Sequence, residues 1–577
     1  MIRLTELKLA LDHTPDDLNA LVRNTLDVAA EDIARFGVFK RSYDARKVAL
    51  LVVYIVDVAL HSTSVEAAVL VKHANNQHVF ATPDMAYMPV AHAPSHVALR
   101  PVVVGFGPCG IFAALLLAQM GFRPIVLERG KKVRERTQDT WGLWRKNVLN
   151  PESNVQFGEG GAGTFSDGKL WSQIKDPRHL GRKVMQEFVE AGAPEDILIE
   201  SHPHIGTFKL VKVVENMREQ IIALGGEIRF EQRVTDVLLE PQAQDAQGHT
   251  HQIRALTVLD VAAQTSYELR ADHVVIALGH SARDTFAMLY ERGVLMEAKP
   301  FSIGFRIEHP QGLIDRARWG RHAGHPLLGA AEYKLVHHVD SGAGKGRSVY
   351  SFCMCPGGTV VAATSEPGRV VTNGMSQYSR NERNANAGIV VGIDPSDYPT
   401  DAASFSEAFG DTVNPHKRPN ETYHPLSGIV LQRQLESRAY VLGGSTYEAP
   451  GQLLGDFLLD RASSKLGGVV PSYKPGVKLG SLAAALPNYA TAAIRDAIPQ
   501  FAKKIKGFDM EDAVLTGVET RTSSPLRITR GDDFQSLNVA GLYPAGEGAS
   551  YAGGILSAGV DGIKVAEALA KATIAQN

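Results

Sequence analysis

The stretch "VVVGFGPCGIFAALLLAQMGFRPIVLERG" (102–130) has the order strand, glycine turn, helix and second strand. In it, Gly105 permits the tight turn, Gly107 lets a diphosphate approach the backbone, and Gly110 lets the helix pack closely on the strand. The diphosphate would meet the positive N-terminal end of the helix. Glu128 closes the second strand, where a carboxylate can bind both hydroxyls of a ribose. The stretch predicts a dinucleotide-binding α/β fold and leaves NAD and FAD as alternatives.

A second glycine-rich stretch, "GEGGAGTFSDGKL" (158–170), follows the first. Its glycines give a flexible loop whose amides can wrap around a phosphate chain, although a plain surface loop has the same composition. Lys169 could place a positive charge beside a flavin. NAD dehydrogenases do not need a second glycine loop at this place, whereas flavoproteins with two dinucleotide-binding domains often have one. The stretch therefore favours FAD.

Two further stretches of the sequence also favour FAD. "HVVIALGHSARDTF" (273–286) is an apolar strand that runs into Gly279 and returns the chain to the dinucleotide domain. In "LNVAGLYPAGEGASYAGGILSAGVDGIKVAEALA" (537–570), a strand precedes Glu547 and a helix follows Gly554. The Glu547 carboxylate would bind the ribitol hydroxyls, and the helix amides would face the flavin, where charge develops on reduction. Together the four stretches predict FAD as the cofactor.

The residues expected to bind this cofactor come from the four stretches and from the end of the strand "EIRFEQRV" (227–234). They are Gly105, Gly107, Pro108, Gly110, Glu128, Arg129, Gly160, Gly161, Gly163, Thr164, Lys169, Val234, Gly279, Gly546, Glu547, Gly553, Gly554 and Ile555. No metal site is expected, because no set of metal ligands can be identified.

The first 95 residues are expected to form an α+β unit of their own. "TPDDLNALVRNTL" (14–26) predicts a helix with Thr14 as N-cap and Asp17 completing a capping box. One strand is predicted before this helix and two after it. This β-α-β-β order is compatible with half of a ferredoxin-like sandwich. The stretch "HAPSHVALRP" (92–101) resembles a linker.

The composition fits an ordinary globular protein of more than one domain. Its 577 residues include 60 Lys and Arg against 62 Asp and Glu, so no global field favours nucleic acid or an anionic membrane. Three cysteines make no disulfide framework and fit a reducing compartment. The start lacks the features of a signal peptide, and the apolar stretch 48–60 is too short to span a bilayer. A cytoplasmic protein without a membrane partner is expected.

Several long phrases resemble a poorly characterised bacterial family, the FAD-dependent dehydrogenases or FAD-dependent proteins. They are "GEGGAGTFSDGKLW", "ALGHSARDTF", "KPFSIGFRIEHPQ", "YSFCMCPGGTVV", "NGMSQYSRN" and "GLYPAGEGASYAGGI". The likeness runs from about residue 100 to the end, and "KRSYDARK" (40–47) resembles the family's N-terminal extension. The resemblance implies a glutathione-reductase-like FAD domain with an inserted domain, and it supplies no substrate.

The expected fold is therefore α/β, with a Rossmann-like FAD-binding domain interrupted by an inserted α+β substrate domain. The N-terminal ferredoxin-like unit covers residues 1–95. The FAD domain covers residues 96–300 and 513–577, and the inserted domain covers residues 301–512. The inserted domain is expected to cover the flavin ring and choose the substrate.

Lys169, Arg306 and His309 are the candidate catalytic residues. Arg306 and His309, in "GFRIEHP" (304–310), could meet an anionic substrate, or they could mark an exposed strand end with a salt bridge. Cys353 and Cys355 form a C-x-C pair that could carry electrons, although the alternation around them suits a strand with buried thiols.

Two basic or histidine-containing stretches have open roles. "HPHIGTF" (202–208) precedes a predicted helix, where a cap and loop are more common than a catalytic pair. "TRTSSPLRITR" (520–530) could form a wall beside the flavin or a solvated loop. No second dinucleotide motif is found, so NAD(P)H would bind only transiently in the substrate cleft, or the substrate itself would be the hydride donor.

The sequence thus predicts an FAD-dependent oxidoreductase acting on an unidentified small molecule. Two alternatives remain. One is an RNA-modifying flavoprotein whose first 90 residues grip RNA through "FKRSYDARK" (39–47), although nucleic acid is not the favoured partner. The other is a flavin-binding protein without catalytic activity.

Overall fold

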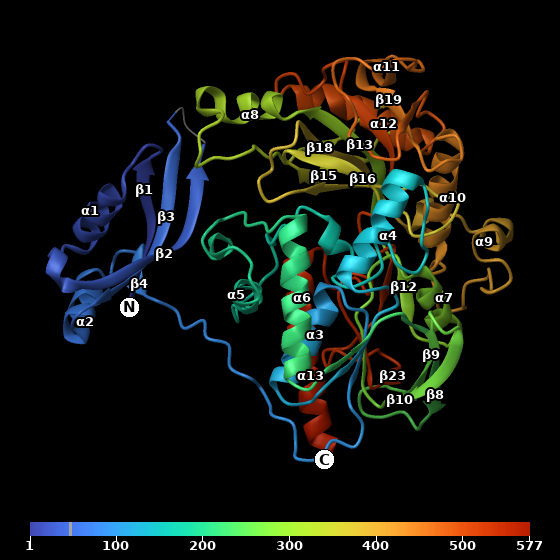
Figure 1. Cartoon of the computed structure of the whole chain (residues 1–577), viewed down its shortest axis with the longest axis horizontal. Coiled ribbons are helices and arrows are strands. Elements are labelled where there is room, and N and C mark those ends of the chain that lie inside the picture. Colours follow the sequence, from blue (N-terminus) through green and yellow to red (C-terminus); the bar gives the residue numbers. More distant parts are fainter. Residues whose placement is uncertain (46–48, 577) are drawn as a thin grey trace.

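The computed structural model describes residues 1–45 and 49–576 of the chain. Figure 1 shows an N-terminal unit at one side, a central α/β unit and a third unit above it. We call these the N-terminal unit (residues 1–81), the central unit and the large-sheet unit, which is built on a seven-stranded sheet.

The N-terminal unit is an antiparallel sheet covered by two helices. Its elements are β1 (Ile2–Ala10), α1 (Pro15–Leu26), β2 (Ile33–Asp44), β3 (Leu51–Leu60), α2 (Thr63–Lys72) and β4 (Val79–Ala81). The sheet order is β2-β3-β1-β4. The predicted capping box of α1 is confirmed, because the Thr14 side chain accepts from the Asp17 amide and Asp17 accepts from the Thr14 amide. The predicted β-α-β-β order is present and continues with α2 and β4.

The central unit is built on a parallel sheet, so the predicted α/β class is confirmed. Its strands are β5 (Val102–Val104), β6 (Ile125–Leu127), β7 (Glu227–Arg229), β11 (Val274–Ile276) and β24 (Leu542–Pro544). They lie in the order β24-β11-β5-β6-β7. The predicted strand, glycine turn and helix of residues 102–130 are β5, the turn, α3 (Pro108–Gln119) and β6. Four of these strands read as continuous apolar runs because both faces of the sheet are covered.

Two layers cover the parallel sheet. On one face Val103, Val126 and Val275 pack against helices, which are α3, α5 (Leu180–Glu190), α6 (Thr207–Ala223) and α13 (Ile555–Gln576). On the other face Val102 and Val104 pack against a four-stranded mixed sheet and a helix. These are β8 (Gln232–Pro241), β9 (His251–Asp260), β10 (Thr265–Arg270), β23 (Val539–Ala540) and α7 (Arg283–Glu291).

One predicted strand of this unit was wrong. "EIRFEQRV" (227–234) reads as a single strand, but the chain divides there into β7, in the parallel sheet, and β8, which pairs with β9 in the mixed sheet. Glu231, between them, has a φ of 56°. That left-handed residue turns the chain from one sheet into the other, which an apolar-polar pattern does not reveal.

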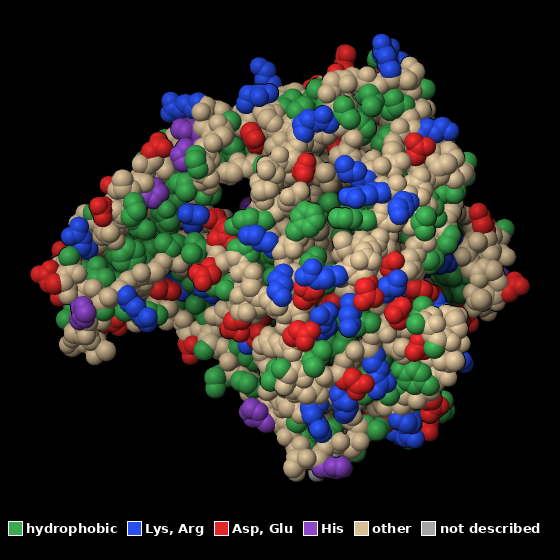
Figure 2. Space-filling model, viewed as in Figure 1, with side chains coloured by type: hydrophobic (Ala, Val, Ile, Leu, Met, Phe, Trp, Pro, Cys, Tyr) green, Lys and Arg blue, Asp and Glu red, His purple; other side chains and the backbone are tan. Residues whose placement is uncertain are grey.

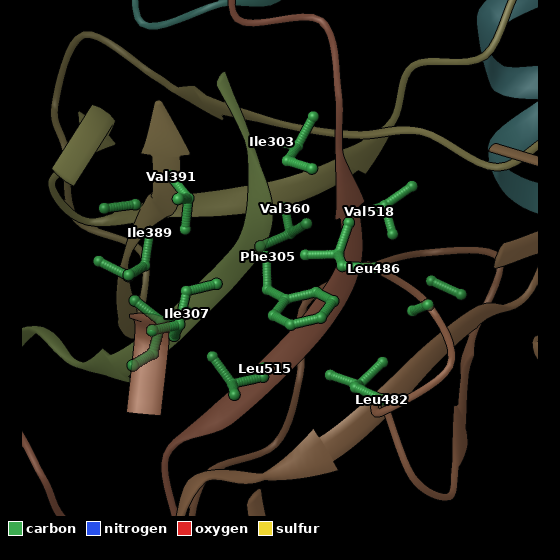
Figure 3. Packing of buried hydrophobic residues seen from close by; sticks show 14 of the residues in the cluster. Ile303, Phe305, Ile307, Val360, Ile389, Val391, Leu482, Leu486, Leu515 and Val518 are labelled. Atoms are coloured by element: carbon green, nitrogen blue, oxygen red, sulfur yellow. The ribbon is translucent and has the colours of Figure 1, made fainter. Parts of the chain in front are cut away.

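The large-sheet unit has a seven-stranded sheet in the order β14-β15-β18-β13-β21-β19-β20. The strands are β13 (Phe301–Pro310), β14 (Val336–His338), β15 (Ser348–Cys355), β18 (Asn384–Ile393), β19 (Ala449–Leu453), β20 (Val477–Leu479) and β21 (Val514–Glu519). Figure 3 shows its core, where Phe305 and Ile307 of β13 lie among Ile389, Leu515 and Val518.

The remaining elements surround these sheets. The helices are α4 (Val133–Lys146), α8 (Gln311–Trp319), α9 (Ala402–Phe409), α10 (Ser427–Leu442), α11 (Leu454–Leu458) and α12 (Asn488–Ala502). The short strands pair as β12 (Met296–Ala298) with β22 (Leu526–Ile528), and as β16 (Gly358–Ala362) with β17 (Thr372–Ser376). In the part of the chain that the structure describes, no helix is both long and apolar enough to cross a membrane.

The connections between units differ in two places from the expected divisions. β21 pairs with β13 and β19, so the large sheet continues past the boundary expected after residue 512. The expected linker 92–101 lies within a longer stretch, residues 82–101, that forms neither helix nor strand. This stretch is anchored on the central unit, because the Tyr87 hydroxyl donates to Glu567 of α13 at 3.0 Å.

Candidate functional site

The first glycine turn packs as tightly as its sequence predicts. A Cβ added at Gly110 would lie 1.9 Å from the Gly105 carbonyl oxygen, so only glycine fits where α3 meets the turn. Gly105 has a φ of 98°, and a Cβ there would lie 2.7 Å from the carbonyl oxygen of Ala277. The turn is therefore held directly against the end of β11.

The second glycine loop lies against the first turn. The Gly160 amide donates to the Phe106 carbonyl at 2.8 Å, and a Cβ on Gly161 would lie 2.9 Å from the Gly107 Cα. A Cβ on Gly163 would lie 3.1 Å from Ile555, the first residue of α13. The loop thus joins the N-terminal ends of α3 and α13.

The third and fourth glycine segments close the same region. The Gly548 amide donates to the Leu278 carbonyl at 3.0 Å, and a Cβ on Gly546 would lie 2.8 Å from the Cβ of Cys109 in α3. In contrast, an added Cβ at Gly279 or Gly554 meets no atom of the described chain within 4 Å. These glycines border open space.

We call this arrangement the glycine cradle. It comprises residues 105–110, 158–164, 279 and 546–555. Four segments far apart in the sequence meet there, and two helices begin in it. Backbone amides at helix N-termini, together with the helix dipoles, favour an anion such as a diphosphate.

Glu128 ties the cradle loops together. Its buried carboxylate accepts hydrogen bonds from the amides of Phe106 at 2.9 Å, Gly130 at 2.8 Å and Gly158 at 2.8 Å. The first and second glycine stretches are thereby fixed to the end of β6. The ribose contact expected of Glu128 stays a prediction, and the loop-holding contacts are a role that the sequence did not reveal.

The neighbouring predicted residues lie beside Glu128. Arg129 forms ion pairs with Glu152 and Asp284, both at 2.9 Å, and lies over the ring of Phe157. Val234 is buried in β8, whose first residue donates its amide to the Glu128 carbonyl at 3.0 Å. The buried Thr164 hydroxyl donates to the carbonyl of residue 159 within the second loop.

Glu547 is the carboxylate of the fourth segment. Burial raises its pKa to about 7, while the positive charge of Lys299 opposes the rise only in part. Even so, 30% of its side chain is exposed, so the carboxylate borders a space that solvent reaches. The nearest imidazole nitrogen, Nε2 of His280, lies 4.0 Å away. Burial, together with the nearby Arg521 and Arg283, lowers the pKa of His280 to about 3, so this ring is neutral at pH 7.

A buried ion network supports the third segment. Arg283 of α7 and Arg521 both pair with Glu436 of α10, at 2.6 and 2.8 Å. Arg521 also donates to the Ser281 hydroxyl at 3.0 Å, next to His280. The network fixes the cradle segment after β11 to the large-sheet unit.

The stretch 520–530 is largely buried, so its interpretation as a solvated loop is wrong. Arg521 is buried, and Arg530, with 9% of its side chain exposed, pairs with Asp561 at 2.6 Å. Asp561 in turn accepts from the Gly546 amide at 2.8 Å. Only the contacts of distant residues reveal this role, and no local pattern in the stretch points to it.

The three candidate catalytic residues are not brought together. Arg306 and His309 both have 0% exposure, inside the large sheet. Arg306 donates to Glu519, Asn386, Asn373 and the Cys353 carbonyl. His309 bonds the Phe508 carbonyl at 2.7 Å, and burial lowers its pKa to about 4. In this structure a substrate reaches neither side chain, and an exposed strand end is equally excluded.

Lys169 lies where the second glycine loop meets the large-sheet unit. Its ammonium group donates to the carbonyl of Met354 in β15 and lies 3.7 Å from the Glu332 carboxylate. Its side chain remains partly exposed. Of the three candidates, only Lys169 is both accessible and directly connected to the cradle.

The two thiols of the C-x-C pair differ. Cys355 is buried, as a buried strand predicts, but Cys353 is exposed. Cys353 has a φ of 40°, and the pairing of β15 with β18 shifts between Phe352 and Cys355. This irregularity turns the Cys353 side chain out of the core. The third cysteine, Cys109, is buried in α3.

The remaining stretches also have definite places. α6 begins at Thr207 with Gly206 as its N-cap, so neither His202 nor His204 caps the helix. In the basic stretch 39–47, Arg41 forms an ion pair with Glu200, whereas residues 46 and 47 lie outside the described residues. Within the described ranges, no group of three or more His, Cys, Asp or Glu side chains could hold a metal ion.

Comparisons with known proteins give the following relationships. The family described as "FAD-dependent protein, C-terminal domain-like" matches residues 300–522, and a domain of unknown function matches residues 1–59. The chain is 44% identical over 569 residues to an uncharacterized protein of Clostridium beijerinckii, with 98% of each chain covered.

Two solved structures show weaker likeness. One is the quinol fumarate reductase FrdA of E. coli, with 12% identity, a TM-score of 0.36, and 83% of this chain and 71% of that chain covered. The other is the glycerol-3-phosphate dehydrogenase of Bacillus halodurans complexed with FAD. It has 13% identity, a TM-score of 0.24, and 52% of this chain and 48% of that chain covered.

Proposed function

This chain belongs to the family of FAD-dependent proteins, and on that premise we propose that it is an oxidoreductase that binds FAD in the glycine cradle. The observation that carries the proposal is the meeting of four glycine segments at the N-terminal ends of α3 and α13. We also assign the central unit to the glutathione-reductase type of FAD domain and the N-terminal unit to the ferredoxin-like type.

The cradle fits the chemistry of FAD. Gly107 and Gly161 meet backbone to backbone, which leaves amides rather than side chains at the start of α3, where the diphosphate is expected. Gly279 and Gly554 border open space, where side chains would intrude. Glu547 offers a partly exposed carboxylate that can accept from ribitol hydroxyls. These backbone amides, the open space and the Glu547 carboxylate together support the proposal that the cradle binds FAD.

When bound, FAD would supply hydride-transfer chemistry. The chain's own contribution is to bind, orient and cover it. Glu128 and the Arg530–Asp561 pair hold the cradle loops in place. The large-sheet unit is proposed to cover the flavin ring. Arg306 and His309 stay inside that unit and support it, while Lys169 faces the substrate side.

The substrate is proposed to be a small molecule that enters between the cradle and β15. If NAD(P)H is the electron donor, we propose that it binds transiently at this same place, because the sequence holds no second dinucleotide motif.

Anaerobic flavin bleaching tests the proposal. The purified protein is mixed in a stopped-flow instrument with NADH, NADPH and a panel of alcohols, amines and hydroxy acids. The expected result is loss of the oxidised flavin absorbance with one or more donors and its return with an added acceptor. A flavin that photoreduces and reoxidises but accepts electrons from none of the donors would instead support a flavin-binding protein without catalytic activity.

A further inference from the structure

The N-terminal unit holds a short segment of the central unit by backbone pairing. Arg41 of the edge strand β2 donates its amide to the Ile199 carbonyl at 2.7 Å, and the Ser201 amide donates to the Arg41 carbonyl at 2.9 Å. The Arg41 side chain also pairs with Glu200, with 2.9 Å between Nε and Oε1. Residues 199–201 therefore join the edge of the N-terminal sheet through an isolated parallel β-bridge between Arg41 and Glu200.

A second segment, from the large-sheet unit, is held by the same N-terminal unit. The Tyr43 hydroxyl donates to the Leu327 carbonyl at 2.6 Å. The next side chain, Leu328, is buried in the N-terminal core, and His325 lies 3.1 Å from Asp12. Residues 325–328 are thus fixed by the Tyr43 hydrogen bond, by apolar packing and by the contact between His325 and Asp12.

Each held segment leads to one member of a polar pair. His202 follows the first segment and Glu332 follows the second, and Nδ1 of His202 lies 2.5 Å from the Glu332 carboxylate. Burial acts to raise the pKa of Glu332, but the His202 hydrogen bond and the charge of Lys169 outweigh it and lower the pKa to about 2. An ionised carboxylate only accepts, so Nδ1 of His202 is the donor to Glu332, and Nε2 is the ring nitrogen that this contact leaves available.

The pair also lies against the second glycine loop. Residues 203–206 run antiparallel to residues 167–170, with hydrogen bonds from the Leu170 amide to Pro203 at 2.9 Å and from the Ile205 amide to Gly168 at 3.1 Å. Lys169, in this loop, contacts both Glu332 and β15. The N-terminal unit, the second glycine loop and the large-sheet unit therefore meet near His202 and Glu332.

The pair is accessible from outside. His202 has a side-chain exposure of 55%, and its ring packs edge-on against the partly exposed Trp171. Lys334 lies over the Trp171 ring, and Arg380 is the further charge that acts on Glu332. Figure 2 shows an opening between the N-terminal unit and the rest of the molecule. A small molecule can therefore reach Nε2 of His202 beside the second glycine loop.

We propose that the N-terminal unit completes the substrate side of the site by holding His202 and Glu332 so that Nε2 of His202 exchanges a proton with the substrate. The proposal rests on the proposed function. Glu332 is a positioning residue, and Lys169 is the neighbouring charge. The substrate class is an alcohol or amine, which must lose a hydroxyl or amino proton when it is oxidised. In that transfer the substrate O–H or N–H bond breaks, its electron pair stays on the substrate, and an N–H bond forms at Nε2.

Hydrogen exchange tests the holding role. The double variant Arg41→Ala/Tyr43→Phe removes the ion pair and the hydroxyl contact, and Arg35→Ala, an exposed arginine on the same strand, is the control. We expect deuterium uptake in residues 199–206 and 325–332 to become at least about tenfold faster in the double variant only, with residues 105–120 unchanged. Unchanged uptake in both segments, or an equal increase in residues 105–120, would overturn the holding role.

The nitrogen assignment is tested by NMR of the protein with 15N-labelled histidine. His202→Gln identifies the signals. We expect the wild type to show the Nδ1–H tautomer at His202, and both Glu332→Ala and the Arg41/Tyr43 double variant to lose this preference. A His202 tautomer that is Nε2–H in the wild type, or that does not change in the variants, would contradict the assignment.

The proton role is tested with the anaerobic alcohol and amine panel. His202→Gln should slow flavin bleaching at least about tenfold at pH 7, without a matching change in the half-saturating concentration. The neighbouring His204→Gln should stay within about twofold, because His204 bonds a backbone carbonyl instead. Bleaching by neither alcohols nor amines, or equal slowing by both variants, would overturn the proposal. FAD content, measured on each sample, separates these failures from a failure of the proposed function.

Discussion

The ionisation of Glu547, a carboxylate of the glycine cradle, depends on its burial. Its pKa, raised to about 7 by burial, exceeds the value of about 4.3 that a glutamate has in an unfolded chain. The folded, cofactor-free protein therefore binds this proton more tightly than the unfolded chain does. The contribution of the group to stability is present at low pH and is lost as the pH rises through about 7.

Glu547→Gln should remove this pH dependence. We expect the cofactor-free variant to gain stability over the wild type as the pH rises from about 4.3 to about 7, levelling off at up to about 3 kcal/mol. Urea unfolding at several pH values measures the difference. Glu407→Gln, an exposed glutamate of α9, is the control. A difference between Glu547→Gln and wild type that does not vary with pH would contradict the assignment.

Gly279 is predicted to be open because the cofactor needs the space. Gly279→Val should weaken FAD binding at least about tenfold, or about 1.4 kcal/mol, with little effect on folding. Gly37→Val is the matched control, because an added Cβ at Gly37 likewise meets no atom of the described chain within 4 Å. Equilibrium titration with FAD distinguishes them. Equal FAD affinity of the two variants would count against the proposed position of the cofactor.

Single residues could be predicted only where their role is local. Gly105 and Gly110 contact each other across one turn, so their spacing reveals their packing. Glu128 holds the Gly158 amide, a contact between separate stretches that no spacing rule describes. Arg306 and His309 were candidates for a substrate contact or for an exposed strand end, but β13 is buried on both faces, and its sequence does not show which strands cover it.

At the scale of elements, α10 joins the large-sheet unit to the cradle. Glu436, on α10, accepts from Arg283, Arg521 and Thr520 and has no exposed surface. Burial acts to raise its pKa, but the two arginines lower it to about 2. Its contribution to stability is therefore present above the ordinary glutamate pKa and is lost as the pH falls toward about 2.

Glu436→Gln should destabilise the protein strongly, because it leaves two buried arginines short of a negative charge. The expected loss is about 3–5 kcal/mol in the free energy of unfolding near neutral pH. Urea unfolding measures this loss, with Glu407→Gln again as the control. A loss below about 1 kcal/mol would show that the network is not a structural joint between the units.

Elements were predictable where a periodic pattern and its end signals coincide. α1 has Thr14 as its cap and Pro15 as its first residue, and it begins and ends as the sequence indicates. The boundary between β7 and β8 lacks such a signal. The chain turns there at Glu231, which has a positive φ, but a glutamate does not indicate a turn in the sequence as a glycine does. β21 was placed with the C-terminal part because its pairing with β13 bridges residues far apart in the sequence.

At the scale of the whole molecule, sheet topology explains why the cradle forms. β5, β11 and β24 are parallel neighbours, so the glycine segments that follow them leave the sheet at the same edge. The sequence predicts each segment and their common ligand. It does not predict that the N-terminal unit reaches back to residues 199–201 and 325–328, since those contacts depend on the packing of separate units.

The central claim is tested most directly by titrating the cofactor-free protein with FAD and following flavin fluorescence and absorbance. The account predicts saturable binding of one FAD per chain and a raised unfolding temperature, corresponding to about 2.7 kcal/mol when free FAD is 100 times its Kd. It also predicts weaker binding in Gly279→Val than in Gly37→Val. A folded protein that takes up no FAD and is not stabilised by it would contradict the account.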